Sequence, residues 1–188
     1  MAQGRNRLFW ILGSAFAIVG LFCAGSIVAV VVIAKKMSPS SGFPPPAGPP
    51  KLVYGIGIND DPISQNAKWV GDELEVRADQ AGVQRLFEAP LERLDQSMLT
   101  YRFRIKTEDP TPSVYAEMWC RVEGFGEAFS RGLDQKVSGA NNWVSVQIPF
   151  YLQKAQYADL LKLNLVFERP GTVRLREIEI LATPLQGQ

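Results

Sequence analysis

The chain contains no histidine and only two cysteines among its 188 residues. The absence of histidine excludes histidine-based acid–base catalysis, Ser-His-Asp triads and histidine-ligated metal sites. Two cysteines cannot build a four-cysteine zinc site or a disulfide framework. Cys23 lies in an apolar run and Cys120 in a strand-like run, so we expect no disulfide between them. The sequence therefore predicts neither a cofactor nor a metal centre.

The larger, C-terminal part of the chain has no excess of positive charge. Residues 1–50 carry four basic side chains and no acidic one, whereas residues 51–188 carry 16 basic and 19 acidic side chains. A domain with a small net negative charge attracts the phosphate backbone of nucleic acids poorly. We therefore expect no nucleic-acid partner.

Residues 8–34 form a run of 27 residues without a single charge. As a helix this run would be about 40 Å long, enough to cross a hydrocarbon layer of about 30 Å. Trp10 and Phe9 stand at its start, where interfacial aromatic residues belong. A cleaved signal peptide is the alternative, but its apolar core usually has about 7–15 residues. The sequence thus predicts a short basic tail at 1–7 and a single transmembrane helix at 8–34, in contact with the lipid bilayer.

The charges that flank this segment bear on its orientation. Arg5, Arg7 and the α-amino group precede it, and Lys35 and Lys36 follow it. The positive-inside rule then slightly favours a cytoplasmic N-terminus, with the C-terminal domain periplasmic or extracellular.

Small residues repeat along the predicted transmembrane helix at spacings of a helix face. These residues are Gly13, Ala17, Gly20 and Ala24. Such a face lets two helices approach closely, so it favours a homo-oligomer. The alternative is that glycine and alanine are simply common in spanning helices.

Six of the fourteen residues 37–50 are proline, so residues 35–50 should form a semi-rigid spacer.

From Lys51 onward the hydropathy alternates with period two, as in Leu99-Thr100-Tyr101-Arg102-Phe103-Arg104-Ile105-Lys106. Turn motifs separate the alternating segments. We expect strands at about 52–58, 73–78, 82–88, 98–107, 113–123, 127–130, 143–151 and 160–181, the last one split at Gly171. Only residues 155–161 are compatible with a short helix.

This pattern predicts an all-β domain at 51–188, an antiparallel β-sandwich or jelly roll. The change of phase between Arg176 and Glu177 indicates a β-bulge in the last strand. The inward positions of the alternating segments predict a core of Leu74, Val76, Tyr101, Phe103, Ile105, Met118, Val122, Val146, Ile148, Leu163 and Leu165.

Several motifs together resemble galactose-binding-like jelly rolls of the carbohydrate-binding-module type, as found in uncharacterised bacterial membrane-anchored proteins. They are Tyr115-Ala116-Glu117-Met118-Trp119-Cys120-Arg121, Phe129-Ser130-Arg131-Gly132-Leu133, Val137-Ser138-Gly139, Asn142-Trp143, Leu163-Asn164-Leu165-Val166 and Gly171-Thr172-Val173. The resemblance covers roughly residues 73–182 and implies a β-sandwich. Family members often end with an acidic pair where this chain has Arg176 and Glu177. This departure weakens an inherited calcium site or sugar-binding role.

The strand at 115–123 carries the candidate binding residues. One of its faces is apolar, while the other presents Tyr115, Glu117, Trp119 and Arg121, followed by Glu123. Aromatic rings among charged groups suit a sugar, because the ring covers the apolar face of a pyranose while polar groups bind its hydroxyls. They suit a protein interface equally well, since Trp, Tyr and Arg are common anchors there. A third alternative is that the loop at 124–142 covers Trp119 and makes it part of the core.

Three other groups of residues can be interpreted either as ordinary structural residues or as parts of a site. Arg102, Arg104 and Lys106 form a solvated face, or pair with Glu117 and Glu123 on a neighbouring strand, or form a patch for anions. Trp143 should close the edge of the sandwich. Asn59-Asp60-Asp61 offers oxygen ligands for calcium, although two acids in one turn are weak evidence.

Catalysis finds little support in the sequence. Glu117 and Glu123 lie six residues apart on one strand face, about 20 Å. Glycoside hydrolysis needs two carboxylates roughly 5–10 Å apart. We therefore predict that the protein is not an enzyme. We expect a membrane-anchored binding or scaffold protein whose domain lies outside the cytoplasm and binds an envelope protein. The alternative is a module that recognises an envelope or extracellular glycan.

Overall fold

The structure, a computed structural model, describes residues 43–107 and 110–187. The basic tail at 1–7, the transmembrane helix at 8–34 and its face of small residues lie outside these ranges and stay predictions. The described residues include no helix that is long and apolar enough to span a membrane. Residues 44–188 form a unit of their own, separate from residues 1–43, and this unit contains the β domain.

The described part of this unit is all-β, as the alternation predicts. Its elements are β1 (Lys51–Ile56), β2 (Ala67–Val70), β3 (Glu73–Ala78), β4 (Gly82–Leu94), β5 (Ser97–Thr107), β6 (Ser113–Val122), β7 (Gly126–Arg131), the 3₁₀ turn η1 (Leu133–Gln135), β8 (Val137–Ser138), β9 (Asn141–Tyr151), β10 (Ala158–Arg169) and β11 (Gly171–Pro184).

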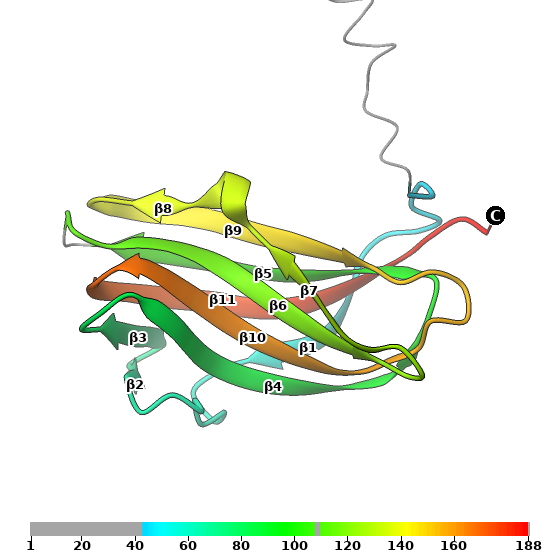
Figure 1. Cartoon of the computed structure of the whole chain (residues 1–188), viewed down its shortest axis with the longest axis horizontal. Coiled ribbons are helices and arrows are strands. Elements are labelled where there is room, and N and C mark those ends of the chain that lie inside the picture. Colours follow the sequence, from blue (N-terminus) through cyan, green and yellow to red (C-terminus); the bar gives the residue numbers. More distant parts are fainter. Residues whose placement is uncertain (1–42, 108–109, 188) are drawn as a thin grey trace, which may run out of the picture. The chain divides into compact units, whose positions relative to one another are not determined.

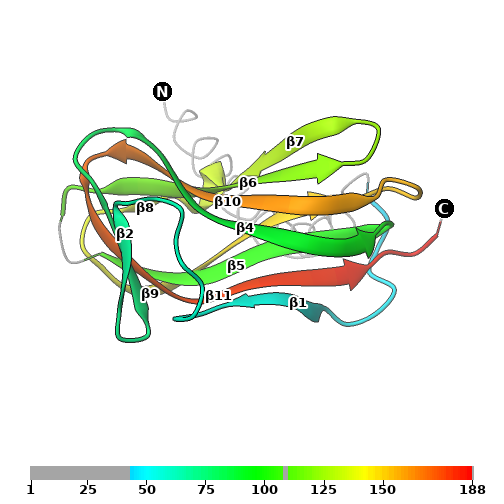
Figure 2. The same cartoon turned by 90° about the horizontal axis from the view of Figure 1, so that it is seen from below.

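Two antiparallel sheets face each other in two layers, which can be followed in Figures 1 and 2. The six-stranded sheet has the order β2-β3-β11-β5-β9, with β1 also paired to β11. The five-stranded sheet has the order β4-β10-β6-β7, with β8 also paired to β6. In Figure 1 the five-stranded sheet lies in front. The prediction of an antiparallel β-sandwich is confirmed.

Most of the expected strands are present, with three differences. Strand β4 continues to Leu94, and the short strands β2 and β8 were not predicted because each is too brief to show alternation. The short helix that the sequence allowed at 155–161 is absent from these residues. Ala155 has a positive φ of 64°, which a right-handed helix does not allow, and β10 already begins at Ala158.

The core lies between the sheets and includes every residue that the alternation placed there. All eleven predicted core side chains are buried, with at most 6% exposure. Successive side chains of a strand point to opposite faces, so a period of two directly separates core from surface.

The predicted bulge in β11 is confirmed. Arg176 pairs with Arg104 and Glu179 pairs with Arg102, so the register of β11 and β5 shifts between these two pairs. Glu177 stands at the bulge with a positive φ of 53°. On its other edge β11 pairs with β3 through Gly171–Leu175 and with β1 beyond the bulge.

The end of the Pro-rich segment is attached to the domain. Pro46 forms a β-bridge with Leu185, and the Ala47 N–H donates to the Pro184 carbonyl at 2.7 Å. The Gln186 N–H donates to the Pro45 carbonyl at 2.9 Å. The last residues of the expected spacer therefore belong structurally with the C-terminal end of β11.

Candidate functional site

Strand β6 separates its side chains between core and surface as predicted. Its inward residues Ala116, Met118 and Cys120 have no exposure. Its outer face lies on the outside of the five-stranded sheet, between β10 and β7. This face carries the four candidate residues Tyr115, Glu117, Trp119 and Arg121.

Glu117 differs from the expectation of an exposed carboxylate, because only 3% of the residue is exposed. Three neighbours surround it. Trp119 Nε1 donates to its Oε1 at 2.8 Å, and Asn164 Nδ2 donates to the same oxygen at 3.1 Å. Arg131 Nε donates to Oε2 at 2.6 Å. The side chain is the centre of a polar network rather than a group free to meet a ligand.

The network also sets the charge of this carboxylate. Burial alone would raise the pKa of Glu117. The hydrogen bonds from Trp119, Arg131 and Asn164, together with the positive charge of Arg131, outweigh burial and lower the pKa below its ordinary value. Glu117 is therefore ionised at neutral pH.

Trp119 is held in one orientation on this outer face. Its indole N–H is fixed by Glu117, and the Phe129 ring lies against it at 5.0 Å between centroids and 44° between planes. Arg131 in turn lies over the Phe129 ring, 4.5 Å from its centroid. The expected cover of Trp119 thus comes in part from β7, and the residue keeps intermediate exposure.

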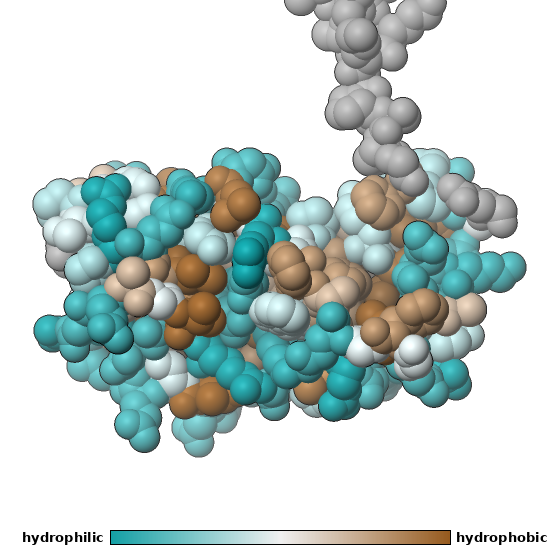
Figure 3. All heavy atoms as spheres, in the orientation of Figure 1, coloured by the Kyte–Doolittle hydropathy of each residue, from teal (hydrophilic) through white to brown (hydrophobic). Residues whose placement is uncertain are grey.

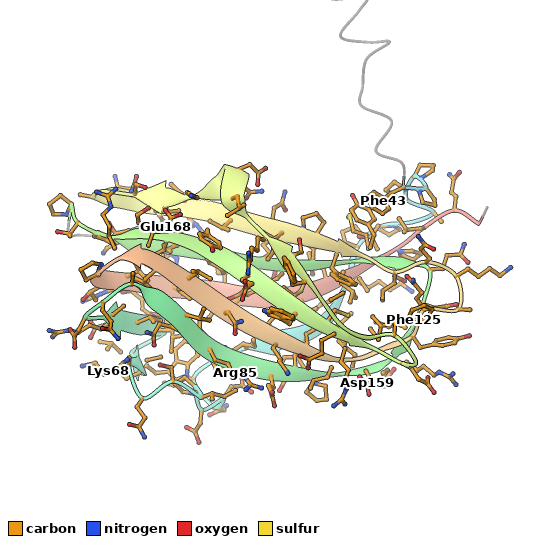
Figure 4. All side chains as sticks on the ribbon, in the orientation of Figure 1. Phe43, Lys68, Arg85, Phe125, Asp159 and Glu168 are labelled. Atoms are coloured by element: carbon orange, nitrogen blue, oxygen red, sulfur yellow. The ribbon has the colours of Figure 1, made fainter. Side chains whose placement is uncertain are left out.

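Trp119 lines a shallow hollow of about 200 Å³ on this face. The hollow is lined by Val83, Arg85, Trp119, Glu127, Lys162 and Asn164, from β4, β6, β7 and β10. Figure 3 shows the sheet face, where apolar patches alternate with hydrophilic side chains, and Figure 4 shows Arg85 on β4. Lys162 and Glu127, which both line the hollow, form an ion pair with each other.

Asn164 is the polar residue of the hollow with unused hydrogen-bonding capacity. It is 6% exposed, and its Nδ2 is bonded to Glu117. Among the described residues, no hydrogen-bond donor reaches its Oδ1. A buried acceptor without a partner costs free energy, so its presence beside a surface hollow favours a ligand that donates to it.

The other two candidate residues lie on the same face but outside the lining of the hollow. Arg121 makes a bidentate ion pair with Asp159, at 2.8 and 2.9 Å. Tyr115 lies under the ammonium group of Lys136, 5.7 Å from the ring centroid. Of the four predicted residues, therefore, Trp119 lines the hollow, and Glu117 holds the Trp119 indole through a hydrogen bond.

The alternative in which Arg102, Arg104 and Lys106 pair with Glu117 and Glu123 on a neighbouring strand is wrong, because β5 and β6 belong to different sheets. Arg102 instead pairs with Glu179, its direct neighbour on β11. Glu123 pairs with Arg93 at 3.1 Å.

Trp143 does not close the sandwich edge as expected. It lies on the outer face of the six-stranded sheet, with the Arg176 guanidinium 4.2 Å and the Lys106 ammonium 5.7 Å from its ring centroid.

Asp60 also has a defined structural role. Its carboxylate accepts hydrogen bonds from the Gly57 N–H and the Tyr54 hydroxyl, at 2.8 and 3.4 Å. No cluster of three or more metal-ligating side chains occurs within residues 43–107 and 110–187.

The sequence alone did not single out Asn164, Lys162, Arg85 or Glu127. Asn164 is visible as a polar position in the apolar run Leu163-Asn164-Leu165. Its neighbour across the sheet is Glu117, which lies 47 positions earlier. Only the register of β10 with β6 reveals that pairing.

No protein-family model matches the chain, and no curated protein matches it. Similar solved structures include a Stig cyclase from Fischerella sp. TAU, with 14% identity, 73% coverage of this chain, 75% of that chain and a TM-score of 0.46. The CBM22-1 xylan-binding domain from Paenibacillus barcinonensis has 13% identity, coverages of 78% and 89%, and a TM-score of 0.44. A family 29 carbohydrate-binding module from Piromyces equi has 13% identity, coverages of 72% and 90%, and a TM-score of 0.41. At these identities and TM-scores, the similarity does not define a ligand or an activity.

Proposed function

We propose that the β-sandwich is a non-catalytic carbohydrate-binding domain, and that its ligand binds over Trp119 on the outer face of the five-stranded sheet. An aromatic ring can cover the apolar face of a sugar, while nearby polar groups bind its hydroxyls. Small-molecule sites commonly combine such an apolar surface with a few fixed polar groups. The proposed ligand is a glycan that contacts Trp119 and donates a hydroxyl hydrogen bond to Asn164.

The observation that carries this proposal is the pairing of a fixed ring with an unused acceptor. Trp119 is held by Glu117 at 2.8 Å, so the ring loses little freedom when a ligand binds. Asn164 lines the same hollow and has an unpaired Oδ1 within the described part of the chain. An open hollow of about 200 Å³ suits one or two sugar rings of a longer chain rather than an enclosed small molecule.

The state of the acidic residues favours binding over hydrolysis. A general acid needs a raised pKa, whereas three hydrogen bonds and the charge of Arg131 lower the pKa of Glu117. Both oxygens of Glu117 are already occupied. Glu127, the acid that lines the hollow, is ion-paired with Lys162.

The proposal includes anchoring of the domain to a membrane. It rests on the uncharged run at 8–34 and the basic residues that flank it. In this arrangement the N-terminus is cytoplasmic, and the glycan is part of the cell envelope or the extracellular matrix. Protease added to intact cells should cleave in the Pro-rich segment, and complete protection would reverse this topology.

A protein partner is the second candidate, and the tip of the β6–β7 hairpin favours it. Phe125 stands at this tip with 73% exposure, and Phe129 on β7 has 50% exposure (Figure 4). Strand β7 is also an edge strand among the described strands. Exposed aromatic residues beside an unpaired edge suit a protein interface.

The test is a glycan array probed with the full-length chain in neutral detergent, beside crosslinking and pull-down from membranes. The proposal predicts that one class of glycan binds and that Trp119→Phe and Trp119→Ala weaken this binding. Phe125→Ser is the matched control, because it removes an exposed aromatic residue outside the hollow. The protein interface would instead be supported if no glycan on the array binds and if a protein is crosslinked to the wild-type chain but not to the Phe125→Ser chain.

A further inference from the structure

The outer face of the six-stranded sheet carries positively charged side chains in an unfavourable arrangement. Arg176 of β11 is directly opposite Arg104 of β5, and Arg174 is directly opposite Lys106. Side chains in such cross-strand positions have Cβ atoms about 5 Å apart, and like charges there destabilise a sheet. Arg174 is compensated by Glu73 and Glu75 of β3, at 3.0 and 3.5 Å, so the row of Arg104 and Arg176 is the one that matters here.

A single carboxylate lies between the two guanidinium groups of the Arg104–Arg176 row. Glu177 Oε1 is 3.7 Å from Arg104 Nη1 and 3.5 Å from Arg176 Nε. Both distances exceed those of charge-assisted hydrogen bonds, which are about 2.7–2.9 Å. Arg176 Nε makes no hydrogen bond within the described residues. One exposed carboxylate thus compensates the charge of two arginines, and it forms a short hydrogen bond with neither.

Trp143 completes this group of side chains. The Arg176 guanidinium lies over its ring at 4.2 Å, and Arg104 Nη2 donates to its backbone carbonyl at 3.4 Å. These contacts keep both guanidinium groups on one side of the sheet. Their side chains are 34% and 29% exposed, so each retains surface that an anion can reach.

Glu177 stands at the bulge of β11 in a left-handed backbone conformation. A non-glycine residue with a φ of 53° is uncommon, and bulges are frequent beside functional sites. Glu177 is 59% exposed and also lines a neighbouring hollow of about 190 Å³, lined further by Ile56, Gly57, Ile58, Trp69, Gly71 and Asp72. Its carboxylate therefore has space to move away from the two arginines.

We propose that Arg104 and Arg176 form an oxyanion site in which Glu177 occupies the place of a phosphate group until such a ligand displaces it. A phosphate oxygen pair suits two adjacent guanidinium groups, because arginine binds phosphate through paired N–H donors. The site lies on the sheet opposite to the Trp119 hollow, so it is independent of the glycan proposal. The phosphate is either a free solute or a lipid headgroup.

The test measures binding of inorganic phosphate to the full-length chain in neutral detergent by titration calorimetry, at constant ionic strength adjusted with chloride. We expect Arg104→Gln and Arg176→Gln each to weaken binding at least about tenfold. Glu177→Gln removes the internal competitor and should tighten binding several-fold. Arg77→Gln is the control, because it removes the same charge from the same sheet at an exposed pair with Asp79.

A second arm separates the two sources of phosphate. Detergent micelles that contain phosphatidic acid are compared with micelles that contain phosphatidylcholine. A lipid headgroup is the ligand if the chain binds phosphatidic acid more tightly than both phosphatidylcholine and inorganic phosphate. A free phosphate is the ligand if phosphatidic acid and inorganic phosphate bind with equal affinity. The proposal is overturned if neither probe binds the wild-type or the Glu177→Gln chain, or if Arg77→Gln weakens binding as much as Arg104→Gln. Thermal unfolding of each variant confirms that it is folded.

Discussion

Trp119 donates its indole hydrogen to the carboxylate of Glu117, two residues earlier on the same face of β6, at 2.8 Å. The hydrogen bond joins a partly exposed aromatic ring to a buried, ionised acid. It explains why a carboxylate occupies a position with almost no solvent contact. The acid orients the ring, and the ring together with Asn164 and Arg131 satisfies the acid.

Replacing Glu117 by glutamine should destabilise the fold. The amide would lose the ion pair with Arg131, and its NH₂ group would face either that guanidinium or the indole N–H. Because Arg131 is partly exposed, we expect a loss of about 1–3 kcal/mol rather than the larger cost of a fully buried pair. Urea unfolding of the full-length chain in neutral detergent measures it. Arg121→Gln, at an exposed ion pair of the same strand, should change stability far less.

The Glu117 carboxylate should make the free energy of unfolding depend on pH in the acidic range. The pKa of Glu117 is lower in the folded chain than its ordinary value of 4.5, so its contribution is full above that pH. It is lost as the pH falls through the lower, folded-state pKa. The difference in unfolding free energy between wild type and Glu117→Gln should therefore shrink below about pH 4.5. A difference that stays constant down to about pH 3 would contradict a lowered pKa of Glu117 in the folded chain.

Cys120 should be unreactive while the domain is folded. Burial, with a smaller contribution from the charge of Asp159, raises the pKa of its thiol to about 12. The reactive species is the thiolate, so alkylation at about pH 8 should require unfolding. Mass spectrometry of the Cys120 peptide after iodoacetamide treatment, with and without urea, measures this. Complete labelling without urea would contradict the placement of Cys120 in the core.

Tyr101→Phe should leave the stability unchanged or raise it by about 1 kcal/mol, because it removes a buried hydroxyl that lacks a partner. Tyr101 has no exposure, and within the described residues its hydroxyl makes no hydrogen bond. The neighbouring ring of Phe103, 4.9 Å away, would be retained. Thermal unfolding compares the two chains. A clear loss of stability would reveal a polar contact for Tyr101.

Alternation of apolar and polar residues was sufficient to predict the core and the two faces of β6. Leu74, Met118 and Leu165 are buried because period two separates the faces of any strand. The pattern does not specify which strands become neighbours. It therefore left open that Arg102 pairs with Glu179 in one sheet while Glu117 meets Asn164 in the other. The candidate site depends on that register, so its strand face was predictable but its full lining was not.

The most direct test measures the affinity of the full-length chain for a neutral glycan identified on the array. Wild type is compared with Trp119→Ala and with Trp143→Ala, which removes a tryptophan from the opposite sheet. We expect Trp119→Ala to weaken binding at least about tenfold, or about 1.4 kcal/mol, while Trp143→Ala binds as wild type. Folded Trp119→Ala that binds the glycan with unchanged affinity would contradict the proposed site.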